Sequence, residues 1–408
     1  MTDDRITRRA FLRGTALAGV GAFLAACAAK GTESASAARS AGATSGAVAA
    51  SGSAPTSAPA GKIGGNLNFA NQIGYIDISD DGSTHPSLDQ FSRETGVTVN
   101  YDESITDNED FFNTDLQGPL SQNHPAAWDL IVVTDWMAAR LIRLGWLEAI
   151  DLTTTPNFPA NLQPHYHGRP FDPDTKFAAP WQSGMTGIGF DRKKTGEVTS
   201  LAVLWEAAYK GRITYLAGKM RDTVGLAAIK LGFEPAKITR SQFNAALAEI
   251  DKAVKARLLL RLTDDSYVDA LAAGDAVLGM AFSADVLTLL VPGQRPDQDF
   301  QFAVPREGGM LWTDNLCIPK GAPNRKQAQA FINFYYDPAV AAQVEAYVSY
   351  VCPVKGAAEV LKSKNPDVAN NPLIFPPPDV VSRLHQFRAL DANEEKDWSD
   401  AFSKVLPS

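Results

Sequence analysis

Short apolar runs alternate with segments of helical periodicity in the first part of the chain beyond residue 64. Three of these runs predict strands, at residues 66–70, 97–101 and 129–133. The segments between and after them predict helices, at residues 86–95, around 111–116 and at 137–144. Pro86 suits a helix start and Gly96 a helix stop, which sets the bounds of the first helix. Strands and helices alternating at these lengths predict a parallel sheet flanked by helices.

A second α/β unit begins near residue 185. Its predicted strands lie at residues 185–191, 211–215 and 276–282, with a helix at 243–256 before the last of them. Two further helices are predicted at 325–335 and after the pair Asp337-Pro338, which combines an N-cap residue with proline at the first helical position. The chain has no internal repeat and is long enough to form two lobes.

Residues 1–26 have the order of an export signal. The pair Arg8-Arg9 precedes a short apolar run, and small residues come directly before Cys27. We expect export through the twin-arginine route, cleavage before Cys27 and anchoring at the outer face of the cytoplasmic membrane by lipid on that cysteine. The alternative is one transmembrane anchor helix, but the run is short for about 30 Å of hydrocarbon. Residues 27–63 are rich in Ala, Ser and Gly and predict a flexible tether.

The formal net charge is −8. The four arginines of the signal outnumber its two aspartates, so the remainder carries −10. An acidic surface argues against nucleic acid as a partner, because phosphates require clustered Lys and Arg. It is compatible with a cationic ligand, although many exported proteins are simply acidic.

Cys317 and Cys352 are the only cysteines after Cys27. Outside the cytoplasm they could form a disulfide, and two buried free thiols are equally compatible with the sequence. Their spacing suits no zinc site, and the pair His165 and His167 lacks a third nearby ligand, so no metal or other cofactor is expected. The chain also lacks a nucleophile elbow, a phosphate-binding loop and a zinc-protease motif, which argues against an enzyme.

Ligands of parallel α/β sheets bind beyond the carboxyl ends of the strands. Residues at such positions are Gln72, Tyr75, Thr134, Asp135, Trp136, Lys219, Arg221, Asp222, Phe282, Ser283 and Asp285. Trp312 and Asp314 lie two residues apart in an extended segment, so they should share a face. Aromatic rings and carboxylates together suit an alkyl ammonium ligand. The alternative is that these are ordinary core aromatics and a capping aspartate.

Several stretches, in this order, resemble the polyamine-binding (spermidine/putrescine) proteins of bacterial ABC importers. They are FSRETG at 91–96, WDLIVV at 128–133, PFDP at 170–173, the segment 205–211 and EGGMLWTD at 307–314. The resemblance implies the type II fold of periplasmic binding proteins, with two α/β lobes that close on a ligand. It places residues 64–184 and 312–360 in lobe 1, and residues 185–311 and 361–408 in lobe 2.

The resemblance also implies a set of ligand-binding residues, with Asp314 pairing with an amine. The set is Gln72, Tyr75, Thr134, Trp136, Asp222, Phe282, Trp312, Asp314 and Tyr350. Gln72 stands where the family usually has Trp, Phe282 where it has a stacking Trp, and Asp222 where it has Glu. Lys219 falls at a position where the family has an aspartate. Two departures, Gln72 and Lys219, remove an aromatic and a carboxylate from the expected cleft.

We therefore expect an extracytoplasmic solute-binding lipoprotein that delivers a polyamine to permease and ATPase subunits. Another small cationic or zwitterionic solute is the alternative within the same class. An extracytoplasmic enzyme and a sensor or adhesion lipoprotein are alternatives from other classes.

Overall fold

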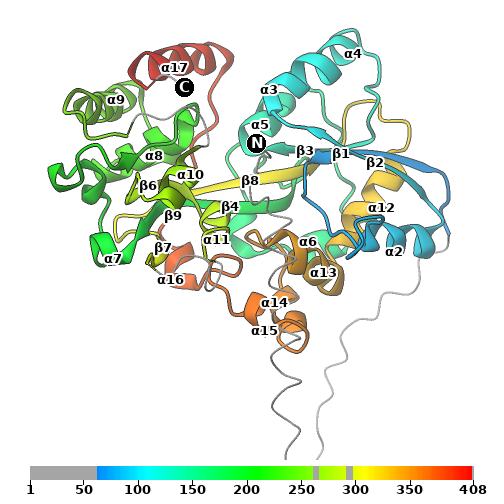
Figure 1. Cartoon of the computed structure of the whole chain (residues 1–408). Coiled ribbons are helices and arrows are strands. Elements are labelled where there is room, and N and C mark those ends of the chain that lie inside the picture. The colour runs from blue at the N-terminus through cyan, green and yellow to red at the C-terminus, as the bar shows by residue number, and fades with distance from the viewer. Residues whose placement is uncertain (1–61, 261–265, 291–296, 407–408) are drawn as a thin grey trace, which may run out of the picture.

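A computed structural model describes residues 62–260, 266–290 and 297–406 (Figure 1). The predicted export signal, Cys27 and nearly all of the predicted tether lie outside the described residues. The described chain forms two lobes, as Figure 1 shows. No helix within the described ranges combines the length and hydrophobicity needed to span a membrane.

The sheet of lobe 1 confirms the three predicted strands. They are β1 (Asn66–Gln72), β2 (Thr98–Ile105) and β3 (Leu130–Thr134), and β1 pairs in parallel with both others. Helix α2 (Pro86–Thr95) ends at Gly96, and α5 (Asp135–Leu144) ends at Gly145. Both glycines have the left-handed backbone that a helix stop requires. The predicted helix around 111–116 comprises α3 (Asn108–Phe111), a π-helical turn (Phe112–Leu116) and α4 (Gln117–Ser121).

Lobe 2 is built on short strands and longer helices. The strands β5 (Ile213–Thr214) and β6 (Leu278–Phe282) are parallel, and β7 (Phe300–Ala303) lies off the main sheet path. Its helices are α7 (Arg192–Thr195), α8 (Met220–Lys230), α9 (Arg240–Lys255), α10 (Tyr267–Ala273), α11 (Ser283–Leu287) and the C-terminal α17 (Ala392–Val405). A capping box from Thr239 and Gln242 begins α9.

Two long strands join the lobes. β4 (Ala179–Asp191) and β8 (Gly309–Cys317) pair antiparallel and lie in the middle of the sheet order β2-β1-β3-β8-β4-β6-β5. β8 pairs with β3 in lobe 1, and β4 pairs with β6 in lobe 2. Every residue of β4 is buried, which fits a strand covered on both faces. Each lobe therefore combines parallel strands with antiparallel crossing strands, and Figure 1 shows both crossing strands passing between the lobes.

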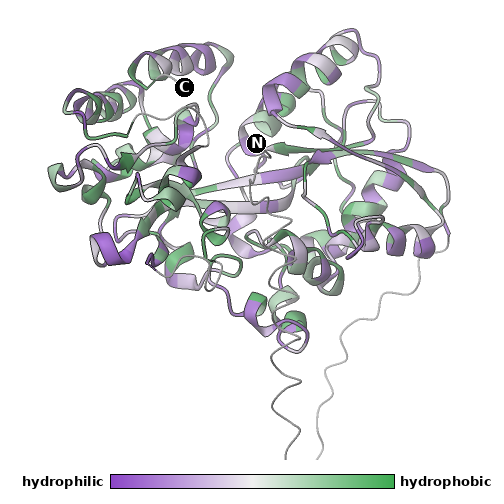
Figure 2. Ribbon diagram, viewed as in Figure 1, coloured by the Kyte–Doolittle hydropathy of each residue, from purple (hydrophilic) through white to green (hydrophobic). Residues whose placement is uncertain are grey.

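The chain returns to lobe 1 after β8. Helices α12 (Arg325–Tyr335), α13 (Pro338–Val348), α14 (Ala357–Leu361) and α15 (Pro366–Ala369) follow, then α16 (Pro378–Val381) and β9 (Leu384–His385). The side chain of Asp337 accepts the Ala339 N–H, as expected of the predicted N-cap. Figure 2 shows hydrophilic stretches on the outer sides of α2 and α17.

The hydrophobic cores show where the chain changes lobe. The core of lobe 2 contains residues of β4, β6, α8 and α9, together with Leu390, Trp398 and Phe402. Leu361 and Ala369 belong instead to the lobe 1 core that contains β1, α12 and α13. The predicted crossing at residue 361 is therefore too early. The physical reason is that α14 packs on α13, which keeps this segment in lobe 1.

The two remaining cysteines are free and buried. Successive residues of β3 alternate between two lobe 1 core clusters, Leu130 in one and Ile131 in the other. Cys317 lies in the cluster of Ile131, and Cys352 in the cluster of Leu130. They face opposite sides of the sheet, so the disulfide alternative is wrong and the free-thiol alternative holds.

Candidate ligand-binding site

A cavity of about 450 Å³ lies between the two lobes. All nine residues of the predicted ligand set line it: Gln72, Tyr75, Thr134, Trp136, Asp222, Phe282, Trp312, Asp314 and Tyr350. They come from β1 and the loop after it, β3, α5, β6, β8, α8 and the segment after α13. Six of the nine are also positions that the strand-end rule selected. Of the other residues that this rule selected, Asp135, Lys219, Arg221 and Asp285 line the cavity and Ser283 does not.

Asp314 is the buried carboxylate on the lobe 1 side of the cavity. Its side chain is 3% exposed. The Tyr75 hydroxyl donates to Oδ2 at 2.8 Å, and the Thr134 hydroxyl donates to Oδ1 at 2.6 Å. Burial raises the pKa of Asp314 to about 6, although these two hydrogen bonds and one from Gln72 oppose the rise. A carboxylate held this way gains strongly from a cationic partner that replaces its lost hydration.

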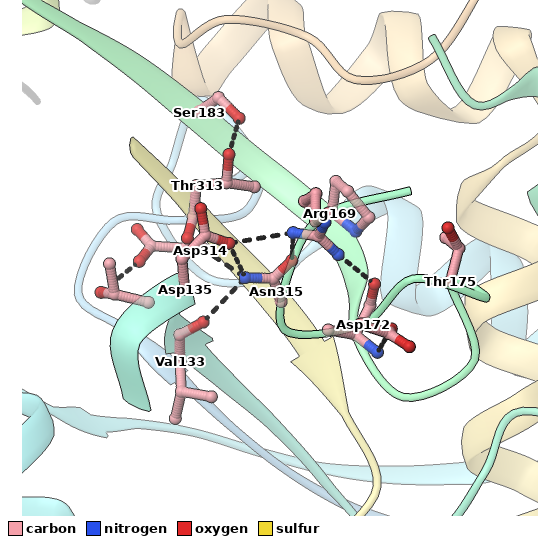
Figure 3. A network of polar contacts seen from close by, with 12 residues as sticks. Val133, Asp135, Arg169, Asp172, Thr175, Ser183, Thr313, Asp314 and Asn315 are labelled. Atoms are coloured by element: carbon pink, nitrogen blue, oxygen red, sulfur yellow. Dashed lines mark hydrogen bonds and ion pairs between the residues drawn. The ribbon is translucent and has the colours of Figure 1, made fainter. Parts of the chain in front are cut away.

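A buried ion pair between Arg169 and Asp135 lies beside Asp314. Arg169 is 2% exposed and donates to Asp135 Oδ1 at 2.9 Å and to Asn315 Oδ1 at 2.6 Å. Asn315 donates in turn to Asp135 Oδ1 at 2.9 Å, so three side chains fix one another (Figure 3). The charge of Asp135 contributes to the raised pKa of Asp314. Since Arg169 already pairs with Asp135, Asp314 remains the carboxylate available to a ligand.

Asp222 is the carboxylate on the lobe 2 side. It lies in the first turn of α8, and its Oδ1 accepts the Thr186 hydroxyl at 2.5 Å. Burial raises the pKa of Asp222, while that hydrogen bond and the charges of Lys219 and Arg221 lower it. Lys219 is exposed, lies at the N-cap of α8 and borders the cavity. Lys219, which stands where the family has an aspartate, therefore places a positive charge close to Asp222.

Four aromatic side chains form a continuous wall along the cavity. Edge-to-face contacts join Tyr75 to Tyr350 at 5.0 Å, Tyr350 to Trp312 at 5.7 Å and Trp312 to Phe282 at 5.7 Å between ring centroids. The Trp312 ring lies directly on Gly184 of β4, where an added Cβ would be 2.1 Å from Cζ2. Gly184 therefore makes room for this ring. The rings present faces to which methylene groups and ammonium groups bind favourably.

Some residues that shape the site escaped sequence reasoning. Asn108 donates to the Thr134 hydroxyl and accepts the Thr134 N–H, both at 3.0 Å, and so orients the donor to Asp314. Asn108 follows the end of β2, so the strand-end rule could have identified it from the sequence. Phe387, Arg388 and Ala389 also line the cavity, but they lie in a connecting segment without a distinguishing pattern. Among the described residues, no cluster of three or more potential metal ligands exists around His165 or elsewhere.

Comparison with known proteins identifies the family of the chain. The model of the bacterial extracellular solute-binding protein family matches residues 87–376. The chain belongs to this family. A protein of Escherichia coli K12 named spermidine/putrescine-binding periplasmic protein is 30% identical over 296 residues, which cover 72% of this chain and 80% of that protein. The putrescine-binding periplasmic protein of the same organism is 25% identical over 332 residues, covering 77% and 86%.

The fold is that of solved binding proteins. A spermidine/putrescine ABC transporter substrate-binding protein from Streptococcus pneumoniae superposes with a TM-score of 0.68 at 24% identity, covering 83% of this chain and 98% of that chain. The two-lobe fold expected from the sequence is thereby confirmed. Since the family consists of solute-binding proteins, the chain is a binder and not an enzyme.

Proposed function

We propose that this protein binds a polyamine of the putrescine or spermidine type between its lobes and presents it to the permease of an ABC importer. The observation that carries the proposal is the pair of carboxylates, Asp314 from lobe 1 and Asp222 from lobe 2, on opposite sides of one cavity. Each accepts hydrogen bonds from hydroxyl groups, which leaves the negative charge for a cation. The aromatic wall suits the methylene groups between two ammonium groups.

Ligand binding favours the closed arrangement of the lobes. A diamine that pairs with Asp314 and Asp222 at once makes contacts that exist only when the lobes are close together. The ligand therefore shifts the population toward the closed form, by its higher affinity for that form. The permease then distinguishes loaded from empty protein by its shape. The named ligands of the two relatives, spermidine and putrescine, agree with this chemistry.

The N-terminal residues extend the proposal to location. Arg8-Arg9, the apolar run and Cys27 support export followed by lipid attachment at Cys27. The acylated protein would then remain near the permease, and residues 27–63 would act as the tether. Cys27→Ser should leave an unlipidated, poorly processed protein. Wild-type protein recovered from the cytoplasm with its first 26 residues intact would contradict this part of the proposal.

Calorimetry on the mature protein tests ligand identity. Putrescine, spermidine, a zwitterionic amino acid and a neutral sugar are titrated separately, and a thermal-shift series with the same compounds provides a second readout. A polyamine at a hundred times its Kd should raise the free energy of unfolding by about 2.7 kcal/mol. Asp314→Asn should weaken polyamine binding by roughly 2–5 kcal/mol, because an ammonium group would then be buried without its partner.

Asp174→Asn is the matched control, because Asp174 is exposed and pairs with Lys176 at the surface. It should leave polyamine affinity unchanged. Saturable binding of the zwitterion or sugar, with no response to either polyamine, would overturn the proposed function. The zwitterion is the informative competitor, since Lys219 could pair with its carboxylate.

A further inference from the structure

Arg221 reaches across the cavity from lobe 2 to lobe 1. It lies in the first turn of α8, beside Asp222. Its guanidinium carbon lies 4.9 Å from the ring centroid of Trp136, which belongs to α5 of lobe 1. At this distance the cation interacts favourably with the ring face. Both residues line the cavity.

An ion pair with Glu395 holds the Arg221 guanidinium in this position. Its Nη2 donates to both carboxylate oxygens of Glu395 in the C-terminal helix α17. The side chains of Arg221 and Glu395 are only 20% and 21% exposed. A planar cation fixed between a carboxylate and an aromatic ring keeps little freedom to move aside for a ligand. Arg221 is therefore a permanent positive charge at the Trp136 side of the cavity.

The sheet register shows which part of the cavity remains for a ligand. Along β8, Met310 lies opposite Thr186, the hydrogen-bond partner of Asp222. Trp312 comes two residues later and Asp314 four residues later. The backbone positions level with Asp314 and with the hydrogen-bond partner of Asp222 are thus four residues apart along β8, with Trp312 midway. The methylene groups of a diamine that bridges the two carboxylates would therefore pass Trp312.

The Arg221 guanidinium lies at the side of the cavity where α8 approaches α5. Thr134 donates to Asp314, and Trp136 follows two residues later at the start of α5. A third ammonium group of a longer polyamine that reached this side of the cavity would meet a ring already covered by the guanidinium, and a like charge. On the basis of the proposed function, we infer that Arg221 is a specificity-determining residue: its guanidinium occupies the face of Trp136 and makes the cleft select a two-ammonium ligand over a three-ammonium one.

The test compares the ratio of the putrescine and spermidine affinities between variants. A substitution that impairs lobe closure in general weakens both affinities and leaves their ratio unchanged. The Kd values of putrescine and spermidine are measured by calorimetry for wild type, Arg221→Met and Arg221→Lys. Wild type should prefer putrescine. Arg221→Met keeps an unbranched apolar stem and removes the charge, so it should shift the ratio toward spermidine by roughly tenfold. Arg221→Lys keeps the charge and should retain a preference for putrescine.

Arg143→Met is the matched control. Arg143 also joins the lobes, through a hydrogen bond of 2.8 Å from Nη1 to the Leu390 carbonyl, but it does not line the cavity. This variant should change both affinities by the same factor. Should Arg221→Met fail to fold, Arg221→Gln removes the charge while keeping a side-chain donor for Glu395, and it should shift the ratio in the same direction.

The outcomes separate the two proposals. If wild type binds neither polyamine, the proposed function fails. If both bind but Arg221→Met leaves their ratio unchanged, or Arg143→Met shifts it equally, the inference about Arg221 fails while the proposed function stands.

Discussion

Thr134 lies directly opposite Asp314 in the β3–β8 ladder, and its hydroxyl donates to the Asp314 carboxylate at 2.6 Å. This single relationship joins the end of a lobe 1 strand to the strand that crosses between the lobes. One of its two hydroxyl donors, Thr134, is therefore fixed by the sheet itself, while the other, Tyr75, comes from the loop after β1. A preorganised acceptor loses little conformational entropy when an ammonium group binds.

Ligand binding should weaken as the pH falls below about 6. Burial raises the pKa of Asp314 to about 6, so the carboxyl group becomes protonated below that pH and can no longer pair with an ammonium group. In this range the affinity should fall by up to about tenfold per pH unit, because binding then requires loss of a proton. Calorimetry from pH 5 to pH 8 measures the effect. A polyamine affinity that stays constant across this range would contradict the assignment of Asp314.

Gly184→Ala should weaken ligand binding through Trp312. The new Cβ would lie 2.1 Å from Cζ2 and 2.6 Å from Cε2 of the indole, so the ring must leave its place in the aromatic wall. We expect at least about a tenfold loss of polyamine affinity, and a loss of stability of roughly 1–3 kcal/mol. Gly118→Ala is the control, since nothing lies within 4 Å of its added Cβ. Equal affinities of the two variants would show that the ring position does not matter.

The stability of the protein should fall as the pH rises, because Glu345 is buried in its protonated form. It is fully buried on α13, and within the described ranges neither carboxylate oxygen has a hydrogen-bond partner of good geometry. Burial raises its pKa from 4.5 to about 8. Between these values the folded state holds a proton that the unfolded state releases. The free energy of unfolding should therefore fall from about pH 4.5 to pH 8, by at most about 1.4 kcal/mol per pH unit.

Glu345→Gln removes this proton linkage. Relative to wild type, the variant should gain stability progressively from pH 5 to pH 8, measured by urea unfolding in the absence of ligand. The neighbouring groups that titrate, Tyr335 and Cys352, have pKa values raised above their ordinary range and stay neutral over this interval. Glu359→Gln, an exposed position on α14, should reproduce the wild-type profile. A stability difference independent of pH would show that Glu345 is not protonated in the folded state.

Lys219→Asp should strengthen the binding of cationic ligands. The substitution removes a positive charge beside Asp222 and adds a carboxylate at the N-terminus of α8, where the helix dipole favours it. Putrescine and spermidine should both bind several-fold more tightly at low salt. Lys237→Asp, at an exposed position of lobe 2, controls for the change in net charge. Equal effects of the two substitutions would place the Lys219 charge outside the site.

The local elements of the fold follow from the sequence because their signals are local. Pro86 and Gly96 delimit α2, the apolar run at 129–133 becomes β3, and Asp337 caps α13. Trp312 and Asp314 border the same cavity, as their spacing of two in an extended segment predicts. These outcomes depend on helix capping, burial and strand alternation, which act over a few neighbouring residues.

Contacts between distant residues were decided only by the tertiary structure. Arg221 meets Trp136, Trp312 lies on Gly184, and the side chain of Arg169 lies between Asp135 and Asn315. No periodicity predicts such pairs, because they depend on strand register and on how the two lobes pack. The same reason explains the cysteines: the sequence left a disulfide open, and the alternation of side chains across the sheet placed Cys317 and Cys352 in separate cores. Local signals in the sequence account for the elements and for the chemical character of the site, while packing determines which side chains meet there.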